Sequence, residues 1–270
     1  MQSEKEFLSK YRIDEYERPS VTADIVALRI RSTQSNNYRL NSENKLTILL
    51  IKRGEHPYKD CWALPGGFLI PGETIEDCAL RETKEETNVQ PVSIMPIGVF
   101  SKPGRDPRGW IISNAYVSII SEDSVNQKGQ DDAKDAQWFD VKFEQNENGE
   151  YNLCLNYEDN ELKALLTEKE ERFGITTFNV NYNEGFAFDH AEIIATALSM
   201  LRNDAKNIEI IFDFLPEKFT LSALQRVQET IMNISILPAN FRRKISGFVT
   251  ETDEYTIGLG HRPAKLYKRK

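Results

Sequence analysis

The chain has 270 residues, 40% of them hydrophobic, and a net charge of −8 at pH 7. No apolar run approaches the roughly 18 residues that a membrane-spanning helix needs, and the first residues lack the charged and then apolar pattern of a signal peptide. The three cysteines have no metal-ligand spacing and cannot form a paired disulfide framework, so we expect a cytoplasmic protein, without a membrane partner, of two domains.

The charge is divided unevenly along the chain. Residues 215–270 carry a net charge of +5, which leaves −13 for residues 1–214. An acidic body followed by a basic tail predicts separate partners for the two parts, and the basic part is suited to a polyanion.

Strands are expected first along the chain. Residues 21–31 and 46–53 are rich in Val, Ile and Leu and predict two strands with a polar loop between them. Residues 62–68 lead into a predicted helix over 74–87. Further strands are predicted at residues 94–100, 111–120 and 137–141. A mixed sheet flanked by helices, an α/β fold, accounts for this order.

The helix predicted over residues 74–87 carries an apolar stripe that becomes acidic without changing face. The residues of this stripe, at helical spacing, are Ile75, Cys78, Ala79, Glu82 and Glu86. An arbitrary acidic helix is usually a solvated surface with weak ion pairs. Burying several carboxylates without compensation costs far more, so a cation is expected between them, and oxygen ligands favour Mg2+ or Mn2+. Arg81 is expected to orient or neutralise one of the carboxylates.

The spacing of these residues resembles the box of the Nudix family, which runs Gly, five residues, Glu, seven residues, Arg-Glu-hydrophobic-x-Glu-Glu-x-Gly-hydrophobic. The matching residues here are Gly67, Glu73, Arg81, Glu82, Glu85, Glu86 and Val89. The chain departs at Thr83, where an aliphatic residue is usual, and at Asn88, where Gly is usual. Asn tolerates the left-handed conformation of a helix C-cap, so the second departure is mild.

The resemblance implies a fold and a set of roles. The fold is the Nudix α/β/α sandwich with a mixed sheet. Arg81, Glu82, Glu85 and Glu86 would be catalytic, and Gly67 and the three glutamates would hold a metal ion that polarises a pyrophosphate for attack by water.

Residues 104–110 form a loop that contains Arg105, Arg108 and Trp110. An ordinary hairpin turn with solvated arginines is an equally good interpretation of the spacing alone. Beside an acidic metal site, the arginines are predicted to bind a remote phosphate or ribose, and Trp110 to offer a stacking face. The Arg-Asp-Pro-Arg sequence is similar to that of ADP-ribose-type Nudix domains, which implies an ADP-ribose-like nucleotide or sugar ligand.

The acidic loop of residues 121–135 is a candidate source of a general base, as in some Nudix enzymes. The sequence does not choose between Glu122, Asp123, Asp131 and Asp132, and a plain solvated loop is the simpler interpretation of each.

Two helices are predicted next. Residues 158–172 are highly charged and predict a helix, and residues 189–202 predict an amphipathic helix with Asp189 as its cap. His190, in the first turn of the second helix, is expected to have a structural role.

The basic C-terminal region predicts a helix-turn-helix with a wing. Thr220 is expected to cap a first helix, and a second is expected from Pro238 to Gly247. Strands at residues 248–252 and 264–268 would enclose the tip of a wing. The candidate DNA-binding residues are Asn240, Arg242, Arg243 and Lys244 on the second helix and His261 and Arg262 in the wing.

The order of these motifs resembles Nudix-related transcriptional regulators of the NrtR and AraR type, over nearly the whole chain from about residue 20. The resemblance implies that a Nudix domain senses its ligand while a homodimer of winged helices binds double-stranded DNA. We expect a Nudix domain at residues 1–185, with an N-terminal extension over 1–20, a linking helix region at 186–214 and a winged helix-turn-helix domain at 215–270.

Two functions remain open from the sequence. One is a ligand-responsive transcriptional regulator that binds ADP-ribose or a related nucleoside diphosphate or sugar ligand, with or without hydrolysing it. The other is a Mg2+-dependent hydrolase of the ADP-ribose pyrophosphatase type, whose C-terminal domain serves only dimerisation or completion of the substrate site. Members of the regulator group often lose the box carboxylates, and this chain retains them.

Overall fold

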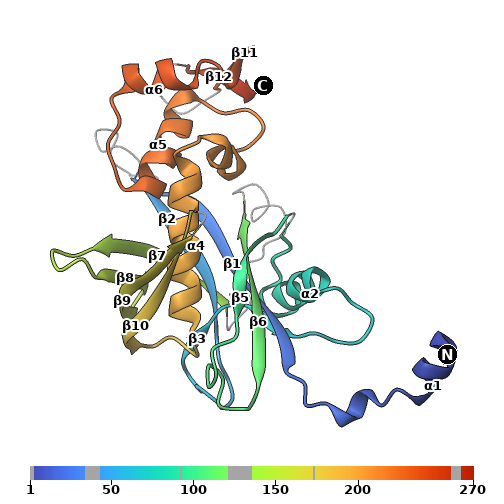
Figure 1. The fold of residues 1–270 in the computed structure, drawn as a ribbon. Helices are drawn as coiled ribbons and strands as arrows, with labels where there is room; N and C mark the ends of the chain where they lie inside the picture. Colours follow the sequence, from blue (N-terminus) through green and yellow to red (C-terminus); the bar gives the residue numbers. More distant parts are fainter. Residues whose placement is uncertain (1–2, 34–42, 92, 121–135, 173, 257–262) are drawn as a thin grey trace.

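The structure is a computed structural model that describes residues 3–33, 43–91, 93–120, 136–172, 174–256 and 263–270. Ten strands of these residues form one mixed sheet, in the order β10-β9-β8-β7-β2-β1-β6-β5, with β3 paired to β2 and β4 paired to β1 (Figure 1). β1 and β6 run parallel, and the other neighbours are antiparallel. The strands are β1 (Ser20–Thr33), β2 (Glu43–Lys52), β3 (Trp62–Ala63), β4 (Gly66–Phe68), β5 (Met95–Phe100), β6 (Ile111–Ile119), β7 (Ala136–Gln145), β8 (Tyr151–Tyr157), β9 (Asn160–Arg172) and β10 (Ile175–Glu184).

Helices cover both faces of this sheet. α2 (Ile75–Thr87) packs on one face and α4 (His190–Ala205) on the other. Successive side chains of a strand point to opposite faces, so Ile25 of β1 packs in the cluster that contains Cys78 of α2, whereas Val26 packs in the cluster around α4. The predicted α/β/α sandwich with a mixed sheet is therefore confirmed. None of the helices in the described ranges has the length and apolarity to cross a bilayer.

The helix predicted over residues 158–172 is wrong, because these residues form β9. Leu162, Ala164 and Leu166 are buried while Glu161 and Lys163 are exposed, which is the period of two of a strand. β9 lies between β8 and β10, and this pairing outweighs the helix preference of its Glu and Lys residues.

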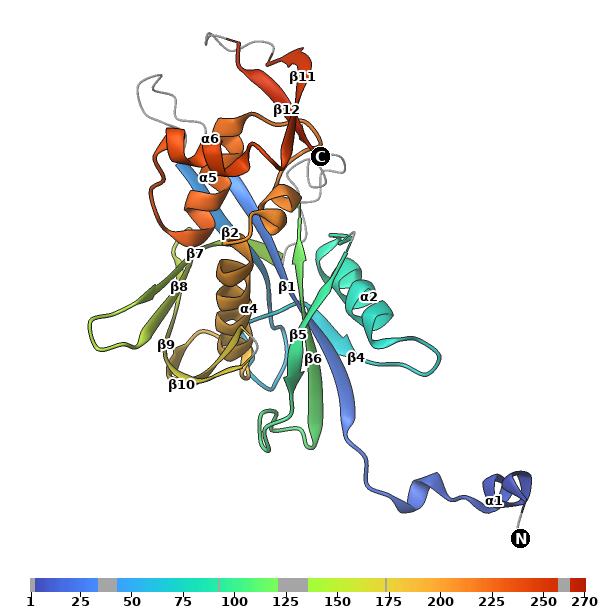
Figure 2. The same cartoon turned by 45° about the horizontal axis from the view of Figure 1, so that its top comes forward.

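The C-terminal residues form a small helical domain with a hairpin (Figure 2). After the 3-10 turn η3 (Glu209–Phe214), the elements are α5 (Leu221–Met232), α6 (Pro238–Ile245), β11 (Val249–Tyr255) and β12 (Lys265–Arg269). The Thr220 side chain accepts a hydrogen bond from Ala223 N at 3.1 Å and caps α5 as predicted. Leu224, Phe241 and Ile245 are buried between the helices. The predicted helix-turn-helix with its hairpin is confirmed.

An N-terminal arm precedes the sheet. It contains α1 (Glu4–Lys10) and the 3-10 turn η1 (Ile13–Glu15), and both figures show it leading away from the sheet at the start of β1. All of residues 3–18 are exposed.

Candidate functional site

The Nudix-like box lies on a strand, a turn and a helix. β4 ends at Phe68, and α2 begins with a capping box in which Thr74 and Asp77 satisfy each other's backbone N–H groups. α2 is followed by its C-cap residue Asn88, whose φ of 57° is left-handed, as expected for the residue in place of the usual Gly. Thr83, the other departure, is fully buried, and its hydroxyl donates to Ala79 O at 2.8 Å.

The acidic residues of α2 lie at the border of its buried face rather than within it. The buried residues of the helix are Cys78, Ala79, Thr83 and Thr87, and Glu82 and Glu86 are half-buried beside them. The predicted inward stripe is thus correct for Ile75, Cys78 and Ala79, which pack on the core, whereas Glu82 and Glu86 lie at its border.

Arg81 holds three carboxylates. Its guanidinium donates to both oxygens of Glu73 at 2.9 and 3.0 Å, to Glu82 Oε1 at 2.7 Å and to Glu85 Oε2 at 3.3 Å. The bond from Arg81 lowers the pKa of Glu73 to about 2, so Glu73 is ionised at neutral pH. This network fixes the entry turn against the helix.

Glu86 has no arginine partner in the described part of the chain. Its Oε2 accepts a hydrogen bond from Gly66 N at 2.9 Å. Burial, together with the charges of Glu82 and Asp24, raises its pKa to about 7. Gly67 lies against the neighbouring glutamate, Glu82, because a Cβ at Gly67 would lie 2.4–2.6 Å from the Glu82 carboxyl atoms.

This crowded set of hard oxygen donors fits a divalent cation, which would offset the burial and the neighbouring negative charges that raise the pKa of Glu86. In the described residues, no three His, Cys, Asp or Glu side chains converge on one ion position, because Glu82 and Glu85 are turned toward Arg81. Binding an ion with Glu82, Glu85 and Glu86 therefore requires Glu85, whose side chain is 62% exposed, to leave Arg81. The four candidates for a general base, Glu122, Asp123, Asp131 and Asp132, lie outside the described residues.

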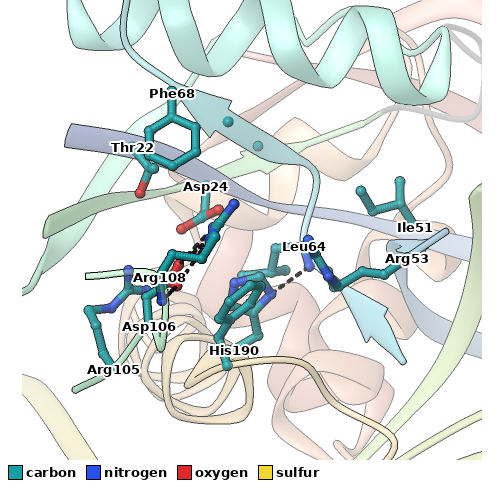
Figure 3. Close-up of a pocket in the computed structure, with 14 residues that line it drawn as sticks. Thr22, Asp24, Ile51, Arg53, Leu64, Phe68, Arg105, Asp106, Arg108 and His190 are labelled. Atoms are coloured by element: carbon teal, nitrogen blue, oxygen red, sulfur yellow. Dashed lines mark hydrogen bonds and ion pairs between the residues drawn. The ribbon is translucent and has the colours of Figure 1, made fainter. Parts of the chain in front are cut away.

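A pocket of about 150 Å³ opens beside this acidic cluster (Figure 3). Gly66 and Gly67 belong to its wall, so it adjoins the strand that contacts Glu86 and Glu82. Its lining residues are Thr22, Asp24, Ile51, Arg53, Ala63, Leu64, Gly66, Gly67, Phe68, Arg105, Asp106, Arg108, Phe188 and His190.

Two of the three predicted ligand residues line the pocket. The Arg105 side chain is 4% exposed and pairs with both oxygens of Asp189 at 2.6 and 2.8 Å. Arg108 donates to Asp106 at 2.7 Å, and its guanidinium lies 5.0 Å from the Phe68 ring. Trp110 is 57% exposed and is not among the lining residues. Asp189 is the N-cap residue of α4 as predicted, but its side chain caps no backbone N–H and forms the ion pair with Arg105 instead.

Several residues of this pocket were not predicted from the sequence as site residues. Arg53 and Arg108 both lie over the Phe188 ring, at 4.9 and 5.4 Å, and Arg53 Nε donates to Pro57 O at 2.8 Å. Burial and the charge of Arg108 lower the pKa of Arg53. Arg108 is paired with Asp106, whereas among the described residues no carboxylate lies within ion-pair distance of Arg53, so this end of the pocket suits an anionic ligand group.

His190 was expected to be structural, and it also lines the pocket. Its Nδ1 accepts a hydrogen bond from Leu64 N at 2.8 Å, and the residue is 5% exposed. Burial lowers the pKa of this imidazole, which therefore stays neutral at pH 7. No local spacing in the sequence points to this position.

The predicted DNA-binding residues of α6 share its solvent face. Asn240, Arg242, Arg243 and Lys244 are exposed, whereas Phe241 and Ile245 are buried. Lys244 Nζ donates to Lys206 O at 3.2 Å. His261 and Arg262 lie outside the described residues.

The chain resembles known proteins over both parts. A NUDIX domain model matches residues 36–152, and a model of the NrtR DNA-binding winged helix domain matches residues 211–268. The ADPR responsive transcriptional repressor NtrR of Acinetobacter baylyi is 29% identical over 98% of this chain and 88% of that protein. The ADP-ribose pyrophosphatase of Methanocaldococcus jannaschii is 41% identical over 51% of this chain and 70% of that protein. The crystal structure of a MutT/nudix family protein from Enterococcus faecalis is 32% identical, with a TM-score of 0.73 over 99% of this chain and 94% of that one.

Proposed function

The chain belongs to the Nudix family and carries a winged-helix domain of the NrtR type, and from this premise we propose that it is a transcriptional regulator whose DNA binding responds to ADP-ribose or a related nucleoside diphosphate. One observation carries the proposal. The same chain contains a pocket lined by three arginines next to an acidic cluster and, on a separate domain, a helix whose exposed face is basic. The first suits a diphosphate ligand and the second suits the phosphates of DNA.

We assign the pocket to the ligand and α6 to the DNA. Arg53 and Arg108 would face the negative charge of the diphosphate, and Phe188 would offer an aromatic face between them. Arg242 and Arg243 would contact phosphates or bases of a groove. The same proposal includes the predicted domain limits and a homodimer that matches a two-fold operator. It also places the protein in the cytoplasm with the DNA.

Two measurements test this function together. Calorimetry measures the binding of ADP-ribose, and fluorescence anisotropy measures the affinity for DNA. The DNA probe is a labelled duplex that the protein itself selects from a random pool, measured over a series of salt concentrations. We expect saturable binding of ADP-ribose and a different DNA affinity in its presence. A protein that binds the duplex identically with and without saturating ADP-ribose would not be a regulator of this kind.

Hydrolysis is a second candidate function, because every charged position of the box is present and Arg81 organises the glutamates. Mg2+ or Mn2+ at Glu82, Glu85, Glu86 and the Gly67 carbonyl would supply charge that polarises the pyrophosphate. The residues of the chain would hold the diphosphate in place beside this site and orient it for attack by water. Release of AMP from ADP-ribose with either ion, abolished in Glu86→Gln, tests this function. If wild-type protein releases no AMP while still binding ADP-ribose, the site is a sensor only.

A further inference from the structure

Helix α4 connects the pocket to the winged-helix domain. Its first residue, His190, lines the pocket, and its last turn lies against α5 (Figure 1). The helix has 16 residues and is therefore about 24 Å long. A helix of this length, buried over most of its surface, moves as a rigid body more readily than it bends.

His190 presents one hydrogen-bond donor to the pocket. Its Nδ1 accepts from Leu64 N at 2.8 Å, so a neutral ring carries its proton on Nε2. Within the described ranges, no acceptor contacts that proton. A ligand oxygen in the pocket can accept it.

The start of α4 is also tied to the pocket wall. Asp189, the residue before the helix, forms the two-bond ion pair with Arg105, and the side chains are 11% and 4% exposed. Because this pair is nearly dry and is held by two bonds, the loop that contains Arg105 and the start of α4 move together.

The other end of α4 packs against α5 of the winged helix in one apolar cluster, and two hydrogen bonds also join the two helices. Gln228 Nε2 of α5 donates to Ala205 O at 2.9 Å, and Arg202 Nε donates to Ile231 O at 3.3 Å. Gln228 Oε1 is buried and, in the part of the chain that the structure describes, has no hydrogen-bond partner. A buried acceptor without a partner costs free energy, so a rearrangement of this junction that gives Gln228 Oε1 a donor is favoured by that amount.

We propose that helix α4 reports the occupancy of the pocket to the winged-helix domain, and that His190 reads the ligand by donating its Nε2 proton to a phosphate or ribose oxygen. This inference rests on the proposed function and names the residue and the element through which the response travels. A ligand that pulls on His190 shifts the helix along or about its axis, and the contacts at Ala205 and Arg202 transfer that shift to α5.

Two substitutions of His190 separate ligand reading from a structural role. In His190→Asn, the amide oxygen can still accept from Leu64 N, but the donor at the Nε2 position is lost. In His190→Gln, the amide nitrogen reaches the Nε2 position, but the acceptor for Leu64 N is lost. If His190 reads the ligand, calorimetry will show ADP-ribose affinity lowered on the order of ten-fold in His190→Asn and mostly kept in His190→Gln. A purely structural His190 gives the reverse order, with the less stable His190→Gln also the weaker binder, and that result overturns the role.

The far end of α4 is tested by Gln228→Leu and Arg202→Met, with Lys169→Met on the exposed surface of β9 as the control. The measured quantity is the ratio of DNA affinities without and with saturating ADP-ribose, on the duplex selected by the wild-type protein. We expect both variants to bind ADP-ribose as the wild type does and to reduce this ratio toward one, while the control keeps it. Gln228→Leu is nearly isosteric and removes the unpaired oxygen, so it tests the junction even if Arg202→Met is unstable.

The outcomes distinguish this inference from the proposed function. A wild-type protein whose DNA affinity ignores ADP-ribose contradicts the proposed function itself. A wild-type protein that responds, together with a folded Gln228→Leu that responds equally, leaves the function standing and overturns transmission through α4.

Discussion

Arg81 neutralises one side of the acidic face of α2 and leaves the other side charged. It pairs with Glu73, Glu82 and Glu85, whereas Glu86 has only a backbone donor, Gly66 N. The two glutamates therefore titrate in opposite directions: the bond from Arg81 lowers the pKa of Glu73 to about 2, and burial raises the pKa of Glu86 to about 7. A cation bound next to Glu86, which holds its proton most tightly, would therefore stabilise the site more than a cation next to Glu73.

The raised pKa of Glu86 predicts a stability that falls with pH. An isolated Glu titrates near 4.5, so between pH 4.5 and 7 the folded protein binds the proton more tightly than the unfolded chain does. The contribution to the free energy of unfolding is present below pH 4.5 and is lost as pH rises through 7, by on the order of 2–3 kcal/mol. We expect the free energy of unfolding of Glu86→Gln, measured with urea in EDTA, to rise relative to that of the wild type by this amount between pH 5 and pH 8. A constant difference between the two proteins across that range contradicts the assignment.

Gly67 is predicted to be required for the metal site rather than for the fold. In Gly67→Ala the new Cβ would displace the Glu82 carboxyl group, which is the end of a flexible side chain. We expect a loss of stability below about 1 kcal/mol and a Mn2+ affinity at least several-fold weaker, measured by calorimetry at pH 8. Gly98→Ala is the matched control, since nothing lies within 4 Å of a Cβ there, and it should bind Mn2+ as the wild type does. Equal Mn2+ affinities in the two variants would show that the ion does not use this side of Glu82.

The sequence predicts the box because its residues are local, and it misses the pocket because its residues are not. Gly67 to Val89 span one turn and one helix, so their spacing determines which of them meet. Arg105 and Asp189 are 84 positions apart and meet only after the sheet and α4 have assembled. Arg53 and His190 likewise show no local pattern that separates them from ordinary surface or core residues.

At the scale of elements, local pattern predicts α5 and α6 well and β9 badly. α5 and α6 each have a start signal, Thr220 or Pro238, and a buried face at helical spacing. β9 consists of helix-favouring residues, and only its two sheet neighbours decide its conformation. Tertiary pairing, which a single sequence does not display, outweighs propensity there.

The exposed face of α6 predicts a clean separation of DNA binding from folding. Arg242 and Arg243 are exposed, and the helix is held by Phe241 and Ile245 on its other side. We expect Arg242→Ala combined with Arg243→Ala to weaken DNA binding at least ten-fold at low salt. The slope of log affinity against log salt should fall by about 4, because a dimer loses two contacts on each protomer. The melting temperature and ADP-ribose affinity should stay unchanged. The control is Lys59→Ala with Lys169→Ala, two exposed cations outside the winged helix. A double α6 variant that binds DNA as this control does would exclude α6 as the reading helix.

At the scale of the whole molecule, the N-terminal arm exposes apolar side chains that nothing in the described part of a single chain covers. Five of its large apolar side chains are between 47% and 61% exposed, namely Phe7, Leu8, Tyr11, Ile13 and Tyr16. A helix of seven residues such as α1 is too short to be stable in water by itself. Beside the start of β1, Trp110 and Ile70 are also exposed, at 57% and 51%. Ser20 N bonds to Trp110 O and Leu69 N bonds to Val21 O, so this second apolar surface lies at the base of the arm.

Two copies related by a two-fold axis would bury each arm on the other copy's apolar surface, so we predict that the chain forms a homodimer held by its arms. We expect the full chain to be a dimer by light scattering and the chain without residues 2–18 to be a monomer with a folded pocket. Because a two-fold operator is bound by two linked winged helices, the shortened chain should bind the selected duplex at least ten-fold more weakly while each domain stays intact. Replacing Phe7, Leu8 and Tyr11 by Ser should have the same effect, and replacing Glu4 and Lys5 by Ser should have none. A shortened chain that remains dimeric and keeps its DNA affinity would place the dimer interface elsewhere on the sheet or on the winged helix.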